Sequence, residues 1–384
     1  MTTKQHKELT YLKSLDGIRG IAVLLVIMIH SHLCSFGWVG VQMFFVLSGF
    51  LITRILVSDS CQNLKGYLLR FYWRRGLRIW PVYFGFLTVC IISYFLIKIP
   101  ESTPTAWPWL VTFTYNFGRF LPGFADSNYY GHFWTLCVEE QFYLVWPFAV
   151  FFLSPIALRR VVIAMVVAGP VVRFVSGFCL GAWLETPAQI AKAVHSLPTS
   201  HLDAFAFGAL LTMLPTKLGE WLKWRAMKVF FAMLAVTVIA GLTHAFILKT
   251  NGLEPAWLAL GYGGMADYFQ YTWTYTLLNA TSAALIFCAL QPTILQRWLT
   301  WPWLSHIGKI SYGLYVFHLP LMHISHSIWP ASYHSPQGLT RFASYFLVAL
   351  ALSTLSYRIF EKRFLGLKDS FWGRRMAVAT KPPV

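Results

Sequence analysis

The sequence predicts an all-α, polytopic integral membrane protein of about ten transmembrane helices. Three observations indicate this fold class: 57% of the 384 residues are hydrophobic, only 12% are charged, and apolar stretches recur from residue 21 to residue 361. An average soluble domain has about 25% charged residues, so a soluble globule is excluded. We expect a single membrane domain over residues 1–384, with a core of about 12–362 and a basic cytoplasmic tail at 363–384.

Ten apolar stretches are the candidate helices, because most are close to the ~20 residues that cross a ~30 Å hydrocarbon core. The first contains the apolar run Ile21–Ile29, and since no cleavage site follows it, we predict an uncleaved helix and not a signal peptide. Two stretches are short, so we expect extended, tilted or re-entrant helices at residues 140–153 and 203–214. The candidates are Leu15–Leu33, Trp38–Val57, Ile79–Ile97, Glu140–Leu153, Val161–Gly181, Asp203–Leu214, Val229–Leu248, Trp273–Leu290, Ile307–Ile328 and Phe342–Glu361.

The charge of the chain predicts its orientation. Lys and Arg total 31 against 14 Asp and Glu, which gives a net charge of +17. In a soluble protein this excess would indicate nucleic acid as a partner, but membrane proteins collect Lys and Arg in cytoplasmic loops. Most of the basic residues fall in alternate connections, so we predict that both termini are cytoplasmic and that the partner is the lipid bilayer, not nucleic acid. The connections at 100–139, 182–202 and 249–272 are rich in Trp, Tyr, Pro and Gly, as is typical of outer interfacial loops over a site.

The first apolar helix carries Arg19 and His30, and ionisable side chains inside a membrane span are costly, so each calls for a partner or a function. They are eleven residues apart, which at ~100° each returns about 20° past three turns and advances ~16 Å, so both lie on one face. A histidine on an apolar helix is more commonly a structural hydrogen bonder. The face that it shares with Arg19 favours a functional pair.

Three arginines, Arg74, Arg75 and Arg78, lie within five residues at the cytoplasmic start of the third stretch. Guanidinium groups bind phosphate oxygens with two parallel hydrogen bonds, so this cluster predicts a phosphate site. The alternative is that the cluster is only the cytoplasmic charge that membrane proteins accumulate. The residues leave both interpretations open.

Glu139 and Glu140 are adjacent carboxylates beside Trp134 at an outer membrane boundary. Successive helical residues lie ~100° apart, so only one carboxylate points directly inward, where it would orient a histidine or bind sugar hydroxyls. The alternative is that both carboxylates simply lie at the membrane–water interface.

Two further motifs carry polar residues among apolar ones. Ser311, Tyr315 and His318 form a polar stripe at i, i+4 and i+7, beside Tyr312, and such stripes often only join helices by hydrogen bonds. The run around Ser48 contains small residues, and close helix packing is its simplest explanation. The six cysteines lack metal-ligand spacing, so we predict no metal site.

Taken in order, these motifs resemble those of the membrane-bound acyltransferase 3 family, whose members acylate hydroxyls of cell-surface glycans and other acceptors. One departure is His201-Leu202-Asp203, where the family pattern has Arg before the Leu-Asp pair. The matching motifs are Leu15–Gly20 followed by His30, Phe44–Leu51, Arg75–Pro81, Trp134–Tyr143 and Ser311–Pro320.

The resemblance implies an O-acyltransferase of the bacterial cytoplasmic membrane with no permanently bound cofactor. The donor would be acyl-CoA, usually acetyl-CoA, with its phosphates on the arginine cluster and its pantetheine arm directed toward His30. The acceptor would be a glycan or glycolipid hydroxyl, as in lipopolysaccharide O-antigen or exopolysaccharide. Four residues would contact substrate: Ser48, Trp134, Tyr312 and His318.

Two mechanisms fit this family. His30 acts either as a general base on the sugar hydroxyl or as a nucleophile that carries the acyl group as an acyl-imidazole. We favour the base, which needs only reach and a suitable pKa. Arg19 would orient the donor or stabilise developing negative charge, and Glu139 or Glu140 would set the imidazole tautomer or hold acceptor hydroxyls.

Two other function classes remain alternatives. A multi-pass transporter or flippase for a glycolipid or small molecule would use the same intramembrane charges, but many transporters have two related halves, which this sequence lacks. A structural subunit of a glycan-assembly complex would leave Arg19 and His30 without a task. Consumption of acyl-CoA discriminates all three.

Overall fold

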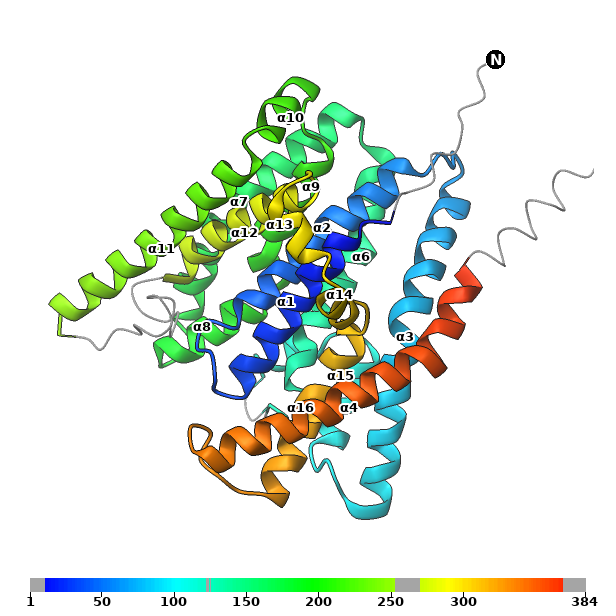
Figure 1. The fold of residues 1–384 in the computed structure, drawn as a ribbon, viewed down its shortest axis with the longest axis vertical. Helices are drawn as coiled ribbons and strands as arrows, with labels where there is room; N and C mark the ends of the chain where they lie inside the picture. The colour runs from blue at the N-terminus through cyan, green and yellow to red at the C-terminus, as the bar shows by residue number, and fades with distance from the viewer. Residues whose placement is uncertain (1–10, 122–123, 125, 253–269, 369–384) are drawn as a thin grey trace, which may run out of the picture. The chain divides into compact units, whose positions relative to one another are not determined.

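The computed structural model describes residues 11–121, 124, 126–252 and 270–368. These residues form helices joined by turns and contain no strand, which confirms the predicted all-α class (Figure 1). The chain forms two compact units. The first comprises residues 1–58, 108–126 and 131–309, and the second comprises residues 59–107, 127–130 and 310–384.

The first unit contains most of the helices. Their ends coincide with capping residues in several places: Ser154 accepts a hydrogen bond from the Ala157 N–H, and Thr186 and Gln189 form a capping box. The helices are α1 (Lys13–His30), α2 (Val39–Ser58), α5 (Tyr115–Gly118), η1 (Gly131–Phe133), α6 (Trp134–Phe152), α7 (Pro155–Leu180), α8 (Pro187–Ser196), η2 (Pro198–His201), α9 (Leu202–Thr212), α10 (Thr216–Lys223), α11 (Ala226–Thr250), α12 (Gln270–Ala289), α13 (Ile294–Leu299) and α14 (Pro302–Lys309).

Glycines let the helices of the first unit cross at very short distances. A Cβ on Gly49 of α2 would lie 2.1 Å from the Phe205 carbonyl oxygen, and a Cβ on Gly208 of α9 would lie 2.0 Å from the Val46 carbonyl oxygen. The backbones of α2 and α9 therefore touch, as interhelical packing through small residues allows. This contact confirms that the small residues around Ser48 serve close packing.

The second unit contains α3 (Leu64–Ile97), α15 (Ser311–Ile328) and α16 (Pro336–Ser356), which a π-helical turn (Tyr357–Glu361) extends toward residue 368. One of the sequence boundaries between the units falls within α4 (Thr103–Val111). The Tyr312 hydroxyl donates to the Ile79 carbonyl at 2.8 Å and so ties α15 to α3.

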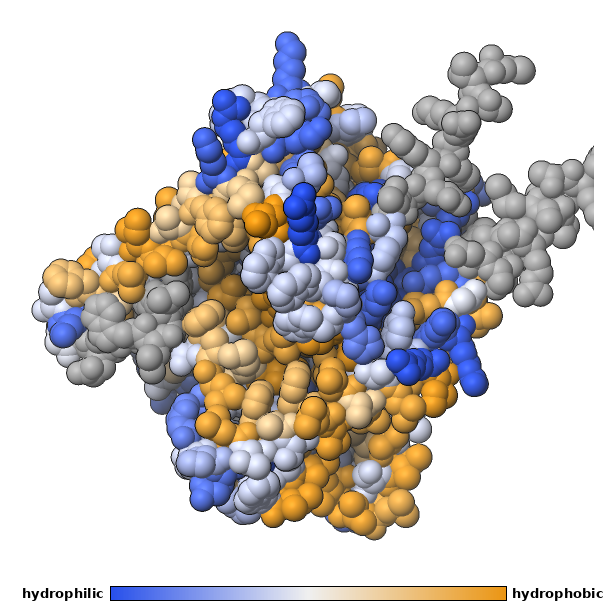
Figure 2. All heavy atoms as spheres, viewed as in Figure 1, coloured by the Kyte–Doolittle hydropathy of each residue, from blue (hydrophilic) through white to orange (hydrophobic). Residues whose placement is uncertain are grey.

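Five helices of the described chain are long and apolar enough to cross a membrane, so the protein is a multi-pass membrane protein. Figure 2 shows the pattern on the first unit, with hydrophobic atoms along α11 and hydrophilic atoms around α10. Ten crossings and the cytoplasmic placement of both termini stay predictions. The five helices are α2, α3, α7, α11 and the continuous helix Pro336–Lys368.

Each predicted stretch falls mainly on helical residues, but several boundaries differ. The ninth was expected to be one helix over Ile307–Ile328, whereas it is divided at Ile310 between α14 and α15. The third was expected to begin at residue 79, whereas α3 begins at Leu64 and includes the arginines. The fourth was expected to begin at residue 140, whereas α6 begins at Trp134. Hydropathy places the ends of an apolar run, but helix hydrogen bonding continues through the polar residues that flank it. Most of the 249–272 connection and of the 363–384 tail lies outside the described residues.

Candidate active site

His30 is the last residue of α1, and its ring orientation is set by its own helix. The ring Nδ1 lies 2.8 Å from the carbonyl oxygen of Val26, one turn earlier. A carbonyl only accepts hydrogen bonds, so Nδ1 carries the proton and Nε2 holds the lone pair of the neutral imidazole. His30 therefore presents Nε2 as its basic atom.

Arg19 is fixed by an acid that sequence reasoning did not single out. Its guanidinium Nη1 lies 2.6 Å from Oδ1 of Asp16, one turn earlier on α1. Asp16 is buried and also accepts a hydrogen bond from the Tyr11 hydroxyl. The Arg19 side chain is thus held by Asp16, three turns from His30 on the same helix.

Ser48 and Glu139, on different helices, meet in the first unit. The Ser48 hydroxyl of α2 donates to Oε1 of Glu139 on α6 at 2.5 Å and lies 3.1 Å from the Tyr143 hydroxyl. A hydrogen bond to an ionised carboxylate is stronger than one between neutral groups. The structure brings together a predicted substrate-binding residue and a predicted catalytic residue.

Trp134 lies in a cluster of rings that includes two histidines, and we call Trp134, His195, His201 and Tyr275 the histidine–aromatic cluster. The ring of His195 lies 4.4 Å from that of Trp134, and its Nδ1 lies 2.5 Å from the Tyr275 hydroxyl. The rings of His201 and Tyr275 are stacked, with centroids 5.7 Å apart. These contacts fix the position of the Trp134 ring, and its contact with substrate stays a prediction.

His201 is held in one tautomer. Its Nε2 donates to the His195 carbonyl oxygen at 2.9 Å, and its Nδ1 accepts a hydrogen bond from the Gln42 amide at 3.3 Å. Burial lowers the pKa of His201 to about 4 and lowers the pKa of His195 well below its ordinary value of 6.5. Both rings are therefore neutral at physiological pH.

Asp203, next to the departure from the family pattern, forms a buried ion pair. Both of its carboxylate oxygens lie 2.8 Å from the guanidinium nitrogens of Arg173, and neither side chain is exposed. The Thr276 hydroxyl and the Asn279 amide also donate to Asp203. Because these residues come from α7, α9 and α12, the pair joins three helices.

Arg119 connects three segments of the predicted outer loops. It donates to Asp126 at 2.8 Å, to the Ser196 hydroxyl at 3.2 Å and to the Gly131 carbonyl at 2.8 Å. Its guanidinium carbon lies 5.7 Å from the centroid of the Trp134 ring. Arg119 thereby fixes the loops around the histidine–aromatic cluster.

The second unit holds the other predicted site residues. Arg74 and Arg75 are half-buried and Arg78 is exposed, all on the first half of α3. The Tyr312 hydroxyl is engaged by α3, and His318 is fully buried with Nδ1 2.7 Å from the Tyr315 carbonyl. Contact of these residues with donor or acceptor stays a prediction.

The comparison with known proteins decides the family. The acyltransferase domain family matches residues 12–358 of the chain. The chain belongs to the acyltransferase 3 family. The match includes every residue predicted for the site, from Arg19 to His318.

Curated acyltransferase relatives resemble this chain over most of its length. It is 25% identical to a putative peptidoglycan O-acetyltransferase of Bacillus subtilis and 26% identical to an O-acetyltransferase of Staphylococcus aureus, each over 94% of this chain. A peptidoglycan O-acetyltransferase of Listeria monocytogenes is 26% identical over 74% of the chain. The matched regions cover 55%, 59% and 52% of these relatives, so the chain spans little more than half of their length. No solved structure matches.

Sequence reasoning missed several residues that contact the predicted site residues. Asp16 stands within the Leu15–Gly20 motif, and its spacing of three residues from Arg19 was a usable signal for a helical ion pair. His195 gave no such signal, because its partner Tyr275 is 80 residues away in the sequence. Arg119 gave none because its partners Asp126, Gly131 and Ser196 do not stand at the spacing of a helical pair from it.

Proposed function

We propose that the chain is a membrane O-acyltransferase that transfers an acetyl group from acetyl-CoA to a hydroxyl of a cell-surface glycan. The observation that carries the proposal is the family match over residues 12–358, together with relatives named as O-acetyltransferases over 94% of the chain. Two of the three relatives are named for peptidoglycan. Peptidoglycan is therefore the first acceptor to test, ahead of lipopolysaccharide O-antigen and exopolysaccharide.

In the proposed reaction His30 is the general base. Its Nε2 takes the proton of the acceptor hydroxyl while the hydroxyl oxygen attacks the thioester carbonyl. The tetrahedral intermediate collapses, the C–S bond breaks, and the CoA thiolate leaves and receives the proton from His30. The hydrogen bond from Nδ1 to the Val26 carbonyl supports this role, because it leaves Nε2 as the basic atom. General base catalysis of this kind contributes roughly 10²- to 10⁴-fold.

Arg19 and Glu139 assist from fixed positions. The guanidinium of Arg19, oriented by Asp16, supplies positive charge for a donor group or for negative charge that develops in the reaction. Glu139, hydrogen-bonded to Ser48, holds an acceptor hydroxyl, and Trp134 offers the face against which a sugar ring packs. Glu140 takes neither role in this proposal.

The donor is proposed to bind through its phosphates. Arg74, Arg75 and Arg78 offer three guanidinium groups within two helical turns, and phosphate oxygens accept paired hydrogen bonds from such groups. The predicted orientation puts these arginines on the cytoplasmic side, where CoA is available. Tyr312 and His318 are proposed as further substrate contacts.

Labelled acetyl transfer tests the proposed function. Membranes that contain the protein are incubated with radiolabelled acetyl-CoA, and the envelope glycans are fractionated into peptidoglycan, lipopolysaccharide and exopolysaccharide. We expect base-labile label in one glycan fraction, absent from membranes without the protein. Label in no fraction and no consumption of acetyl-CoA would contradict the proposal and favour a transporter or flippase.

A further inference from the structure

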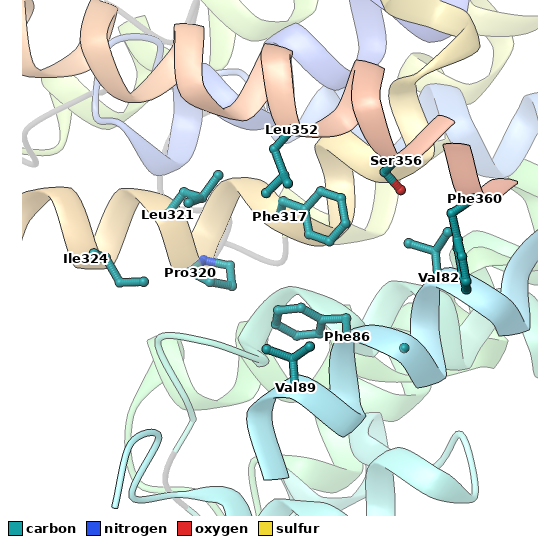
Figure 3. Close-up of a pocket in the computed structure, with 11 residues that line it drawn as sticks. Val82, Phe86, Val89, Phe317, Pro320, Leu321, Ile324, Leu352, Ser356 and Phe360 are labelled. Carbon is teal, nitrogen blue, oxygen red and sulfur yellow. The ribbon is translucent and has the colours of Figure 1, made fainter. Parts of the chain in front are cut away.

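An apolar cavity of about 410 Å³ lies within the second unit, between α3, α15 and the end of α16. Figure 3 shows Phe86 of α3 and Phe317 of α15 facing each other at this cavity, where their rings form a tilted aromatic contact with centroids 6.3 Å apart. Leu352 and Phe360 come from the third side. None of the roles proposed above for the acyl transfer uses this cavity.

The chemistry of the lining excludes polar ligands. Among the lining residues only Ser356 has a polar side chain, and its hydroxyl donates to Oε1 of Glu361 at 3.2 Å. The amides of a peptide or of a pantetheine arm, or the hydroxyls of a sugar, would lose their hydrogen bonds to water there and gain none from side chains. A hydrocarbon chain suits this lining.

One end of the cavity is positively charged. Arg78 precedes Val82 by four residues on α3, which places both within about 40° on one helix face. A Cβ on Gly85 would lie 4.0 Å from Phe360, so the end of α16 lies beside this part of α3. The exposed Lys362 and Arg363 directly follow at that end.

The carboxylate of Glu361 offsets part of the positive charge of these three cations. It is buried, and its Oε1 accepts the hydrogen bond from the Ser356 hydroxyl. The charge that remains at this end is positive, which suits a phosphate group joined to an apolar chain.

We infer that this cavity binds one acyl chain of an anionic phospholipid, whose phosphate lies at the end marked by Arg78, Lys362 and Arg363. The lining part of α3 belongs to a helix long and apolar enough to cross the membrane, so bilayer lipids are the hydrocarbon chains at this depth. Because Arg78 is also among the arginines proposed for CoA, the test measures lipid binding and not acyl transfer.

Photolabelling in vesicles tests the site. The full chain is reconstituted with phosphatidylglycerol that carries a photoreactive group in one acyl chain, and labelled peptides are mapped after irradiation. We expect labelling of the cavity segments of α3 and α15 to exceed several-fold that of the equally apolar, exposed helix α11. Replacing the probe by phosphatidylcholine should lower the labelling several-fold, as should Lys362→Gln combined with Arg363→Gln.

Gly85→Leu fills the cavity. A Cβ at Gly85 meets only Phe360, at 4.0 Å, so leucine enters the cavity without displacing the backbone. The matched control is Gly219→Leu on α10, where a Cβ has no neighbour within 4 Å. We expect Gly85→Leu to abolish the enrichment and Gly219→Leu to keep it. Equal labelling of α3, α15 and α11 in the unchanged protein, or equal labelling by both headgroups, overturns the inference without reference to enzymatic activity.

Discussion

At the scale of single residues, hydrogen-bond chemistry assigns roles that residue type alone leaves open. His30 was chosen from its position on an apolar helix, but its Nδ1 contact with Val26 is what makes Nε2 the basic atom. Glu139 and Glu140 were equivalent in sequence, and the contact with Ser48 distinguishes them. Which of two adjacent side chains faces a partner depends on a rotation of a few tenths of a helical turn, and the spacing of residues in the sequence does not resolve so small a rotation.

The Ser48–Glu139 contact predicts coupled effects on catalysis. Glu139→Gln and Ser48→Ala should each lower acetyl transfer roughly 10- to 100-fold, because a hydrogen bond to a charged group contributes about 1.5–3 kcal/mol. The double variant should be little worse than either single variant, since both remove the same bond. Glu140→Gln is the matched control and should retain most of the activity. If the losses of Glu139→Gln and Ser48→Ala added up in the double variant, the two residues would act independently, which would contradict the prediction.

The buried pair of Arg173 and Asp203 predicts a large effect on stability. Arg173→Leu leaves Asp203 buried without its cation, which typically costs about 3–5 kcal/mol. We expect a clear drop in melting temperature for the detergent-solubilised protein, measured by size-exclusion chromatography after heating. Arg159→Leu, at an exposed position, should leave the melting temperature nearly unchanged. Equal melting of both variants would show that the pair has no such role.

At the scale of helices, the sequence patterns predicted that a helix exists more accurately than where it begins and ends. Hydropathy identified the helix that ends near Ile97, but not that it begins at Leu64, because the Arg-rich start of α3 is helical although it is not apolar. The small residues near Ser48 predicted close packing, but not that the partner would be α9. Partner choice depends on contacts between residues far apart in the chain, for which one sequence holds no signal.

The crossing of α2 and α9 predicts intolerance to a single methyl group. Gly208→Ala would place a Cβ 2.0 Å from a carbonyl oxygen, so the helices must separate, at a cost of about 1–3 kcal/mol. Gly219→Ala, which has open space, should be neutral or slightly stabilising because alanine favours helix. The melting temperatures of the two variants test this prediction. If Gly208→Ala melts at the same temperature as the unchanged protein, the close crossing of α2 and α9 does not form.

At the scale of the whole molecule, composition and charge predicted a multi-pass, all-α protein, and the helices confirm it. The charge pattern further predicts a cytoplasmic Asn63 and an external Glu185. With the six native cysteines replaced by serine and one cysteine introduced at each position, an impermeant maleimide should label Glu185→Cys in intact cells and Asn63→Cys only after permeabilisation. Labelling of Asn63→Cys from outside would reverse the orientation and place the arginines of α3 away from cytoplasmic CoA.

The most direct test of the central claim is acetyl transfer by His30→Ala. Membranes with matched amounts of the unchanged protein, His30→Ala and the exposed-loop control His334→Ala receive radiolabelled acetyl-CoA, and label in the envelope glycans is counted. We predict that His334→Ala transfers like the unchanged protein and that His30→Ala loses roughly 10²- to 10⁴-fold. Transfer by His30→Ala at the rate of the unchanged protein would contradict the claim that His30 is the base.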